Sequence, residues 1–325
     1  MAQIIDITPR ARDVHPVLML ITSHRMDCFV LCLKCLELYT DLSRFKKIYI
    51  LANDVSDEHS LLIKSFQQRH PGVIDVYTTP RGYVPAVVAM QNIIMARHID
   101  DVIIKMYEDV FVTPRWLERL IAAYKMHKNH PRVVLASTVA PVSVTGRQVM
   151  DRALRAHYQR ERSRLPGTSV AHNAILHRFV WEKVLFDGFE EKFLNLKRPE
   201  FSYVPRLSTE CIIYDRRLMD LILPMPLRTV QGNHRVEEYI INSALASQKL
   251  QAAVITNAVV HHFSHMESEA YLRRHISMDD IWWHMTFLDE NPAYKDSNDL
   301  SPRLPGTRNL KLRKLMRDRE LRLLS

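Results

Sequence analysis

Two adjacent carboxylates, Glu108 and Asp109, are the residues whose type and position in this chain best suggest chemistry. They follow the apolar run at 102–106, and α/β folds bind ligands outside the carboxyl ends of their strands. Adjacent acids repel each other unless a cation or a positive ligand neutralises them. The pattern therefore indicates a metal ion held against a phosphate. The alternative is a helix N-terminus with Thr113 as its cap and Pro114 at its first position, the acids merely lying nearby.

Two further pairs of residues could join this site. Glu237 and Glu238 begin a helical segment, and His261 and His262 end an apolar run. Carboxylates and imidazoles are suitable ligands for Mn²⁺, and a carboxylate that does not touch the metal could act as a general base. Ordinary explanations stay open as well. Acids in a first helical turn interact favourably with the helix dipole, and the histidines are equally compatible with hydrogen-bonded loop residues.

The elements that must position these residues alternate between strand and helix in the first half of the chain. This alternation predicts a doubly wound sheet with parallel strands, whose polar strand ends gather along one edge. The second half is less regular, and 145–170 is predicted to be a charged, helical excursion. The predicted strands are 17–22, 47–52, 73–77, 102–106, 133–137, 210–214, 252–256 and 258–262, and the clearest helices are 85–97, 216–223 and 236–248.

Composition limits the class of protein. The chain has 325 residues with 47% hydrophobic content, enough for one large core or two modest ones. Its seven glycines form no GxGxxG or P-loop pattern, which argues against a Rossmann dehydrogenase or a kinase. Cys28, Cys32 and Cys35 share one helical face and Cys211 stands alone, so we expect core packing in a reducing compartment rather than zinc binding. No segment is apolar enough to span a bilayer, and the first residues lack a signal-peptide core, so we expect a cytoplasmic protein.

The net charge of +9 favours an anionic partner, such as a nucleotide, a nucleic acid or an anionic lipid surface. Much of the charge lies in the segment 308–325, where leucines alternate with Arg and Lys. We expect this segment to be a basic helix that makes weak peripheral contact with the inner face of a membrane. Oligomerisation or a frayed tail are the alternatives.

Over roughly residues 16–265 the chain resembles the bacterial glycosyltransferases of the A-type fold (GT-A), close to the large inverting family 2. VLMLITSHRM is similar to the family's first strand and ILANDVSDE to its second. KMYEDVFVTPRWLERL resembles the acidic metal motif, and ECIIYDRRLMDLILPMP resembles the strand and helix before the acceptor site. VEEYIINSALASQKLQAAVITNAVVHHF is similar to the base helix and the closing strand with histidine.

The resemblance implies a GT-A-like α/β fold: a doubly wound, mixed, mostly parallel sheet flanked by helices, with a helical C-terminal extension. It divides the chain into an N-terminal tail at 1–15, a glycosyltransferase domain at 16–266 and the extension at 267–325. Within the domain, 16–113 would bind the nucleotide and 130–266 would bind the acceptor.

The resemblance also implies residue roles. Asp109 would coordinate a divalent cation, Mn²⁺ or Mg²⁺, which bridges the phosphates of the donor, with Glu108 assisting or contacting the sugar. His261, or else His262, would be the additional ligand. Glu238 would be the base that deprotonates the acceptor hydroxyl, with Glu237 as second choice. The donor pocket would be formed by Thr22, Arg25, Asn53 and Asp54, with Arg81 facing the diphosphate.

The sequence departs from the family's pattern at three positions. Tyr107 stands where the family usually has the first aspartate of Asp-x-Asp, Ala52 stands where an aspartate ends the second strand, and the base is glutamate rather than aspartate. These departures leave a non-catalytic nucleotide-sugar-binding scaffold as an alternative function.

The function we expect is metal-dependent, inverting transfer of a sugar from a UDP- or GDP-type donor to the hydroxyl of a glycan or lipid-linked acceptor. A nucleic-acid acceptor is the alternative within the same class. The variable excursion at 141–208 is expected to form much of the acceptor pocket. Trp282, Trp283 and Phe287 are expected to pack on the fold, with stacking on a sugar as the alternative.

Overall fold

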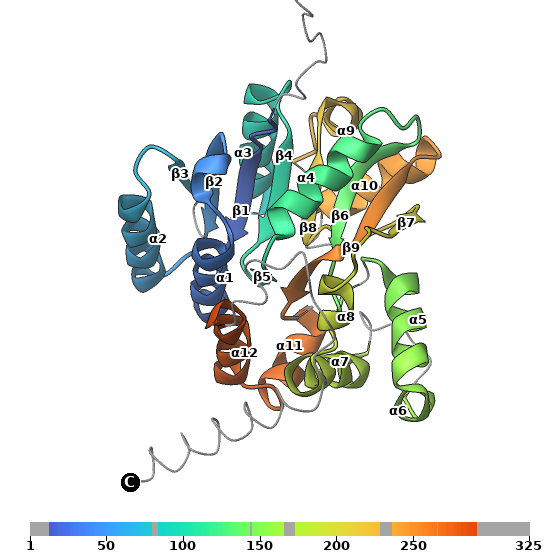
Figure 1. Cartoon of the computed structure of the whole chain (residues 1–325). Coiled ribbons are helices and arrows are strands. Elements are labelled where there is room, and N and C mark those ends of the chain that lie inside the picture. The colour runs from blue at the N-terminus through green and yellow to red at the C-terminus, as the bar shows by residue number, and fades with distance from the viewer. Residues whose placement is uncertain are drawn as a thin grey trace, which may run out of the picture.

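The computed structural model describes residues 13–79, 84–143, 145–165, 173–227, 236–264 and 266–290. Figure 1 shows a curled sheet with helices on both faces and a further helical layer at its lower end. The strands are β1 (Val17–Thr22), β2 (Lys47–Asn53), β3 (Ile74–Thr79), β4 (Ile103–Tyr107), β5 (Val110–Val112), β6 (Val133–Val139), β7 (Phe201–Val204), β8 (Cys211–Tyr214) and β9 (Gln251–His262). The helices are α1 (Met26–Tyr39), α2 (Asp57–Arg69), α3 (Val84–Arg97), α4 (Trp116–His127), α5 (Arg147–His157), α6 (Gln159–Ser163), α7 (Ala174–Asp187), α8 (Glu191–Leu194), α9 (Arg216–Ile222), α10 (Val236–Ser247), α11 (Met266–Arg273) and α12 (Met278–Glu290), with a short 3-10 turn η1 (Leu42–Arg44).

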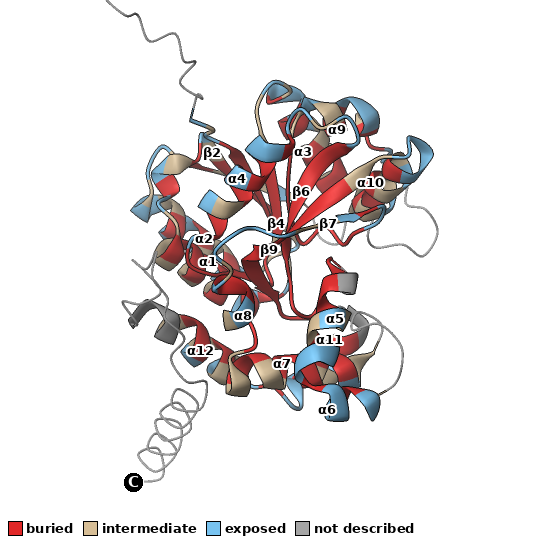
Figure 2. Cartoon of the chain, turned by 45° about the vertical axis from the view of Figure 1, so that its right-hand side comes forward, coloured by how far each residue is buried: buried red, intermediate tan, exposed pale blue. Residues whose placement is uncertain are grey.

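The nine strands form one mixed sheet in the order β3-β2-β1-β4-β8-β6-β9-β5, and β7 pairs with β9. β3, β2, β1 and β4 are parallel, as are β6 and β9, whereas β8, β5 and β7 run in the opposite direction. The prediction of a doubly wound, mostly parallel sheet flanked by helices is confirmed. Continuous apolar runs such as 17–20 are fully buried because helices cover both faces of the sheet (Figure 2).

On each face of the sheet, a polar contact joins neighbouring helices. On one face, the indole Nε1 of Trp116 at the start of α4 donates to Thr40 Oγ1 at the end of α1, over 2.8 Å. On the other face, Gln91 of α3 donates to Glu237 of α10. The C-terminal helices form the lower layer of Figure 1: α12 packs against α1 and α7, and α11 packs against α7.

The acidic pair lies in the turn between β4 and β5, and β5 is not among the predicted strands. The interpretation as a helix cap is wrong, because α4 begins at Trp116 with Arg115 as its N-cap residue. Thr113 instead donates its hydroxyl to the carbonyl of Val259 in β9, over 2.7 Å. The two extended segments predicted at 252–256 and 258–262 are one long strand, with a register shift opposite Thr138 and Val139.

Other predictions can be placed on this fold. Cys28, Cys32 and Cys35 are buried, free thiols of α1, as expected for core packing. Trp282 is half-buried against the core, and the side chain of Phe287 lies outside the described residues, as do Arg81 and the basic segment 308–325. In the part of the chain that the structure describes, no helix has the length and apolar character needed to cross a membrane.

Candidate functional site

The polar ends of five strands meet at one edge of the sheet. Thr22, Asn53 and Tyr107 end the parallel strands β1, β2 and β4, and neighbouring strand ends are offset by one residue, since Thr22 pairs with Ala52 and Tyr107 with Ile21. β8 is antiparallel to β4, so Glu210, which precedes β8, lies beside Tyr107 and accepts its amide hydrogen over 3.3 Å. His262 ends β9 at the same edge. This is the edge at which ligands bind in open α/β sheets.

A pocket of about 220 Å³ opens at this edge. Of the residues predicted to form the site, Thr22, Arg25, Asn53, Glu108, Asp109, Glu237, Glu238 and His262 line it. Asp54 is exposed and is not among the lining residues. The lining includes five carboxylates: Glu108, Asp109, Glu210, Glu237 and Glu238. None of the described lining residues comes from 141–208. Because 144 and 166–172 lie outside the described residues, the expectation that this excursion forms much of the acceptor pocket stays a prediction.

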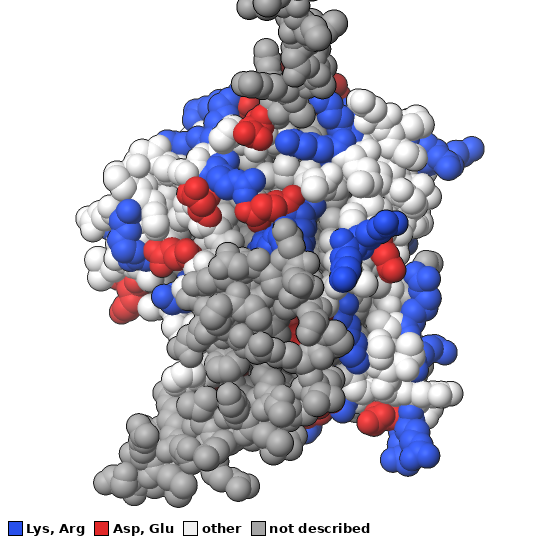
Figure 3. All heavy atoms as spheres, viewed as in Figure 1, with Lys and Arg blue, Asp and Glu red and all other residues white. Residues whose placement is uncertain are grey.

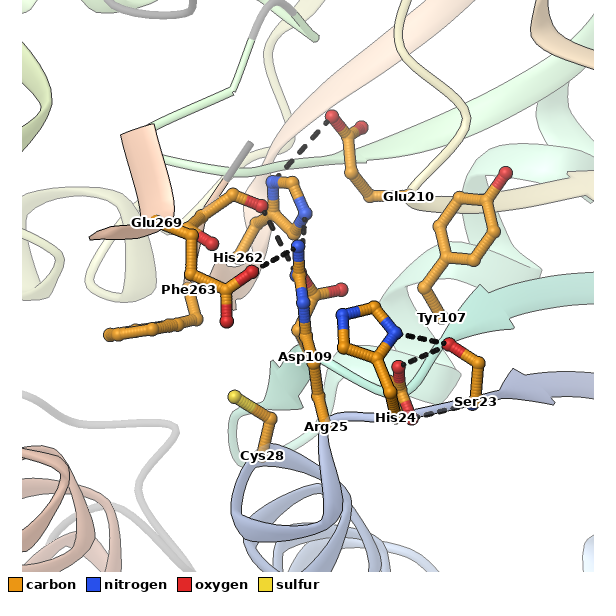
Figure 4. Close-up of polar contacts among 12 residues, drawn as sticks. Ser23, His24, Arg25, Cys28, Tyr107, Asp109, Glu210, His262, Phe263 and Glu269 are labelled. Atoms are coloured by element: carbon orange, nitrogen blue, oxygen red, sulfur yellow. Dashed lines mark hydrogen bonds and ion pairs between the residues drawn. The ribbon is translucent and has the colours of Figure 1, made fainter. Parts of the chain in front are cut away.

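Asp109 is the meeting point of three segments. Its Oδ2 lies 3.1 Å from Nε2 of His262, and the same oxygen accepts a hydrogen bond from Nη1 of Arg25. The second guanidinium nitrogen of Arg25 lies 2.9 Å from Oε2 of Glu269 in α11 (Figure 4). Burial lowers the pKa of Arg25, but the charges of Asp109 and Glu269 outweigh it and raise the pKa above its usual value. Arg25 is therefore a permanent cation held between two carboxylates.

The pairing of β5 with β9 explains why Asp109 and His262 meet. Val110 lies opposite His262 in this antiparallel pair, so the residue before Val110 reaches the imidazole. Two ligands bound at about 2.1 Å and at right angles on one metal ion lie about 3 Å apart. The oxygen and nitrogen of this pair have that spacing, and both are ligand types that Mn²⁺ accepts. Because Arg25 contacts the same oxygen, its guanidinium and a divalent cation would compete for Asp109.

Glu108 fixes the end of β1 to the turn after β4. Its Oε2 accepts hydrogen bonds from the hydroxyl of Thr22 at 2.6 Å and from the amide of Ser23 at 2.8 Å, and the Ser23 hydroxyl reaches its Oε1 at 3.1 Å. Burial raises the pKa of Glu108, and these hydrogen bonds offset only part of that effect. Since Thr22 also contacts His59 at 2.9 Å, its hydroxyl is engaged within the fold.

Glu237 is held inside the fold rather than presented to a substrate. It forms a buried ion pair with Lys105, accepts the hydroxyl hydrogen of Tyr107, and receives Gln91 Nε2 at 2.5 Å. Burial raises the pKa of Glu237, but Lys105 and these hydrogen bonds lower it below its usual value. A carboxylate stabilised in this way is a poor proton acceptor. Its neighbour Glu238 is only half-buried and lines the pocket.

Residues without a predicted role also belong to the site. Glu210 Oε1 lies 3.9 Å from Nδ1 of His262, on the ring edge opposite Asp109, and its Oε2 accepts the Thr145 hydroxyl at 2.7 Å. Ser23 and Glu269 hold Glu108 and Arg25. No local sequence signal identified Glu210, because its position depends on β8 running antiparallel to β4.

His261 lies on the opposite side of β9 from its neighbour His262. Successive side chains of a strand point to opposite faces, and the His261 ring contacts Trp181, with ring centroids 5.5 Å apart. Burial lowers the pKa of His261 to about 4, so its imidazole is neutral at neutral pH. The arrangement rules out a cation shared by His261 and Asp109, and His262 is the histidine that meets the carboxylate.

Comparison with known proteins agrees with this fold. No protein-family model matches the chain, and no curated protein matches its sequence. Among solved structures, the mannosyltransferase PcManGT from Pyrobaculum calidifontis, in complex with GDP-Man and Mn²⁺, has 12% identity and a TM-score of 0.46, covering 93% of this chain and 71% of that one. GalNAc-T7 with UDP, GalNAc and Mn²⁺ has 12% identity and a TM-score of 0.50, covering 93% of this chain and 54% of that one. The chain thus spans about half the length of GalNAc-T7, and the likeness shows a GT-A-like glycosyltransferase fold.

Proposed function

We propose that the chain is a glycosyltransferase that moves a sugar from a nucleotide-diphosphate donor to a hydroxyl group, with inversion. The observation that carries the proposal is the contact between Asp109 and His262 in an acidic pocket at the ligand-binding edge of a GT-A-like sheet. The specific resemblance to the bacterial family 2 enzymes stays a prediction from sequence.

The charge of the pocket supports a metal-dependent reaction. The described lining contains five carboxylates and a single arginine, Arg25, which is already paired with Asp109. Like charges repel strongly at partly buried sites, so an anionic diphosphate needs a further positive charge in order to bind here. Asp109 and His262 are suited to hold Mn²⁺ or Mg²⁺, which when bound would neutralise the departing diphosphate as a Lewis acid. The solved structure of GalNAc-T7, which has a similar fold, contains UDP, GalNAc and Mn²⁺.

The chain's own residues would position the reactants and move the proton. Glu238 is proposed as the base, because it is the half-buried carboxylate of the pair whereas Glu237 is bound by Lys105. The acceptor oxygen would attack the anomeric carbon, the bond from that carbon to the diphosphate oxygen would break, and the acceptor proton would pass to Glu238. Direct displacement at one carbon inverts its configuration. Asn53, at the end of β2, is proposed to contact the base of the donor.

Calorimetric titration of the full chain with UDP- and GDP-sugars, with and without Mn²⁺, tests the proposal. We expect binding heat with at least one donor and a marked loss of affinity after EDTA treatment. Asp109→Asn should behave like the EDTA-treated protein, and the exposed Asp54→Asn should behave like the unaltered chain. Heat that does not depend on the metal, or no heat with any donor, would support the alternative of a non-catalytic scaffold.

A nucleic-acid acceptor is a second candidate, which one surface feature favours. Lys and Arg side chains gather along the right-hand edge of the face in Figure 3, where α5 and α6 lie. The exposed arginines of these helices are Arg152, Arg155 and Arg160, and the exposed Arg164 directly follows α6. Basic surfaces bind nucleic acid with strong salt dependence. A gel shift at low salt that disappears at high salt would favour this acceptor, and no shift at low salt would exclude it.

A further inference from the structure

A second group of possible metal ligands lies behind the pocket, on the other face of β9. Glu190 precedes α8, His261 belongs to β9 and His284 belongs to α12. All three are buried, with 0%, 1% and 3% of their surfaces exposed. One ligand atom from each lies within 4.8 Å of the others, and Nε2 of His284 is 2.5 Å from Oε1 of Glu190.

We propose that Glu190, His261 and His284 form a zinc-binding site that ties the C-terminal helices to the central sheet. Two imidazoles and one carboxylate are one of the three-ligand sets with which proteins bind zinc, water taking the fourth position. Ligand atoms around tetrahedral zinc lie about 3.3 Å apart. The atoms of this cluster lie within 4.8 Å of one another, so their separations would have to change by up to about 1.5 Å on binding. The proposal does not depend on sugar transfer.

An independent observation points to a missing ligand. Nε2 of His261 is buried and has no hydrogen-bond partner among the described residues. Leaving a buried polar group unsatisfied costs about 1–3 kcal/mol. The contact between His284 and Glu190 would not by itself require His261 to lie beside them, whereas a metal ion would use all three residues.

The position of the site gives it a structural role. Glu190, His261 and His284 come from three segments that are distant in the sequence and meet only in the tertiary structure. A zinc ion here would connect α12 and the start of α8 to β9. The next residue of β9 is His262, so the ion would also hold the strand that carries this imidazole to Asp109.

The test uses the full-length chain, stripped with EDTA, reloaded with Zn²⁺ and passed over gel filtration before elemental analysis. We expect about one retained zinc per chain, the stoichiometry of a single structural site, and a higher Tm after reloading. Glu190→Gln, His261→Gln and His284→Gln should each lose the metal. The exposed His157→Gln and the pocket variant Asp109→Asn should keep it, which separates this site from the one proposed for the donor.

A measurement on the unaltered chain keeps the test decisive if a variant fails to fold. X-ray absorption at the zinc edge should show two imidazole nitrogens and at least one oxygen at about 2.0–2.2 Å. A spectrum without imidazole ligands would overturn the proposal. So would the absence of retained zinc in the folded chain, or unchanged retention in all three folded variants.

Discussion

Nε2 of His262 lies 3.1 Å from Oδ2 of Asp109, although one residue ends the long strand β9 and the other sits in the turn after β4. The short strand β5 produces this contact by pairing antiparallel with β9. It places an imidazole and a carboxylate at the edge where a parallel sheet binds its ligand.

Removing either member of this pair should remove metal-dependent donor binding. For Asp109→Asn and His262→Gln we expect a loss of at least about 10–100-fold in Mn²⁺-supported donor affinity, the size of effect typical for losing groups that support a metal site. Isothermal calorimetry measures it. Asp54→Asn, exposed and outside the pocket lining, is the matched control. Equal affinity in Asp109→Asn and the control would contradict the assignment.

Arg25→Met should make the protein depend on metal for stability. Without the guanidinium, Asp109 and Glu269 lose a buried cationic partner, and breaking a buried pair costs about 3–5 kcal/mol. If Mn²⁺ binds Asp109 as proposed, it competes with Arg25 for the same oxygen, so it should raise the Tm of this variant more than that of the unaltered chain. Thermal unfolding with EDTA and with Mn²⁺ measures the difference. Arg44→Met, which removes the exposed ion pair with Glu118, is the control. The same rise in Tm with Mn²⁺ in the unaltered chain, Arg25→Met and Arg44→Met would argue against competition.

Glu238→Gln should slow turnover without weakening donor binding. General base catalysis contributes about 10²–10⁴-fold, and glutamine cannot accept the acceptor proton. Steady-state kinetics together with donor calorimetry separates the two effects. Glu200→Gln, an exposed position outside the described pocket lining, should leave both unchanged. Normal turnover in Glu238→Gln would remove Glu238 from the mechanism.

Glu237→Gln should destabilise the fold, because it leaves Lys105 as a buried cation without its counter-charge. We expect a loss of about 3–5 kcal/mol in the free energy of unfolding. The double variant Lys105→Met/Glu237→Gln should recover much of that loss, since it buries no uncompensated charge. Denaturant unfolding measures the free energy of unfolding of the unaltered chain, the single variant and the double variant. If the double variant is less stable than Glu237→Gln, the ion pair is not the cause.

The same pair predicts a pH dependence of stability. The pKa of Glu237 is lowered in the folded state, because Lys105 and two hydrogen bonds outweigh the effect of burial, which raises it. Its contribution is therefore fully present above the unfolded pKa of about 4.3 and is lost as the pH falls through the lower folded value. The stability difference between the unaltered chain and Glu237→Gln should shrink as the pH falls below about pH 4. A difference that grows on acidification would have the wrong sign.

The sequence determined most strands and helices of the first half, β5 excepted, and the acidic edge of the sheet. The mostly apolar runs 17–22 and 102–106 predicted β1 and β4 to within one residue, because strands buried on both faces are largely hydrophobic. Lys105 is the exception within the second run, and it is buried as the partner of Glu237. The residues after those runs include Glu108 and Asp109, whose place at the carboxyl edge follows from strand direction alone.

The tertiary structure alone decided which side chains meet. β9 is buried along nearly its whole length, so its sequence has no alternation from which the faces of His261 and His262 could be read. Arg25 contacts Asp109, and Lys105 contacts Glu237, only because residues distant in the chain are brought together by sheet order and helix packing. Burying a charged side chain is costly unless it is paired, but only the fold determines which residue is the partner.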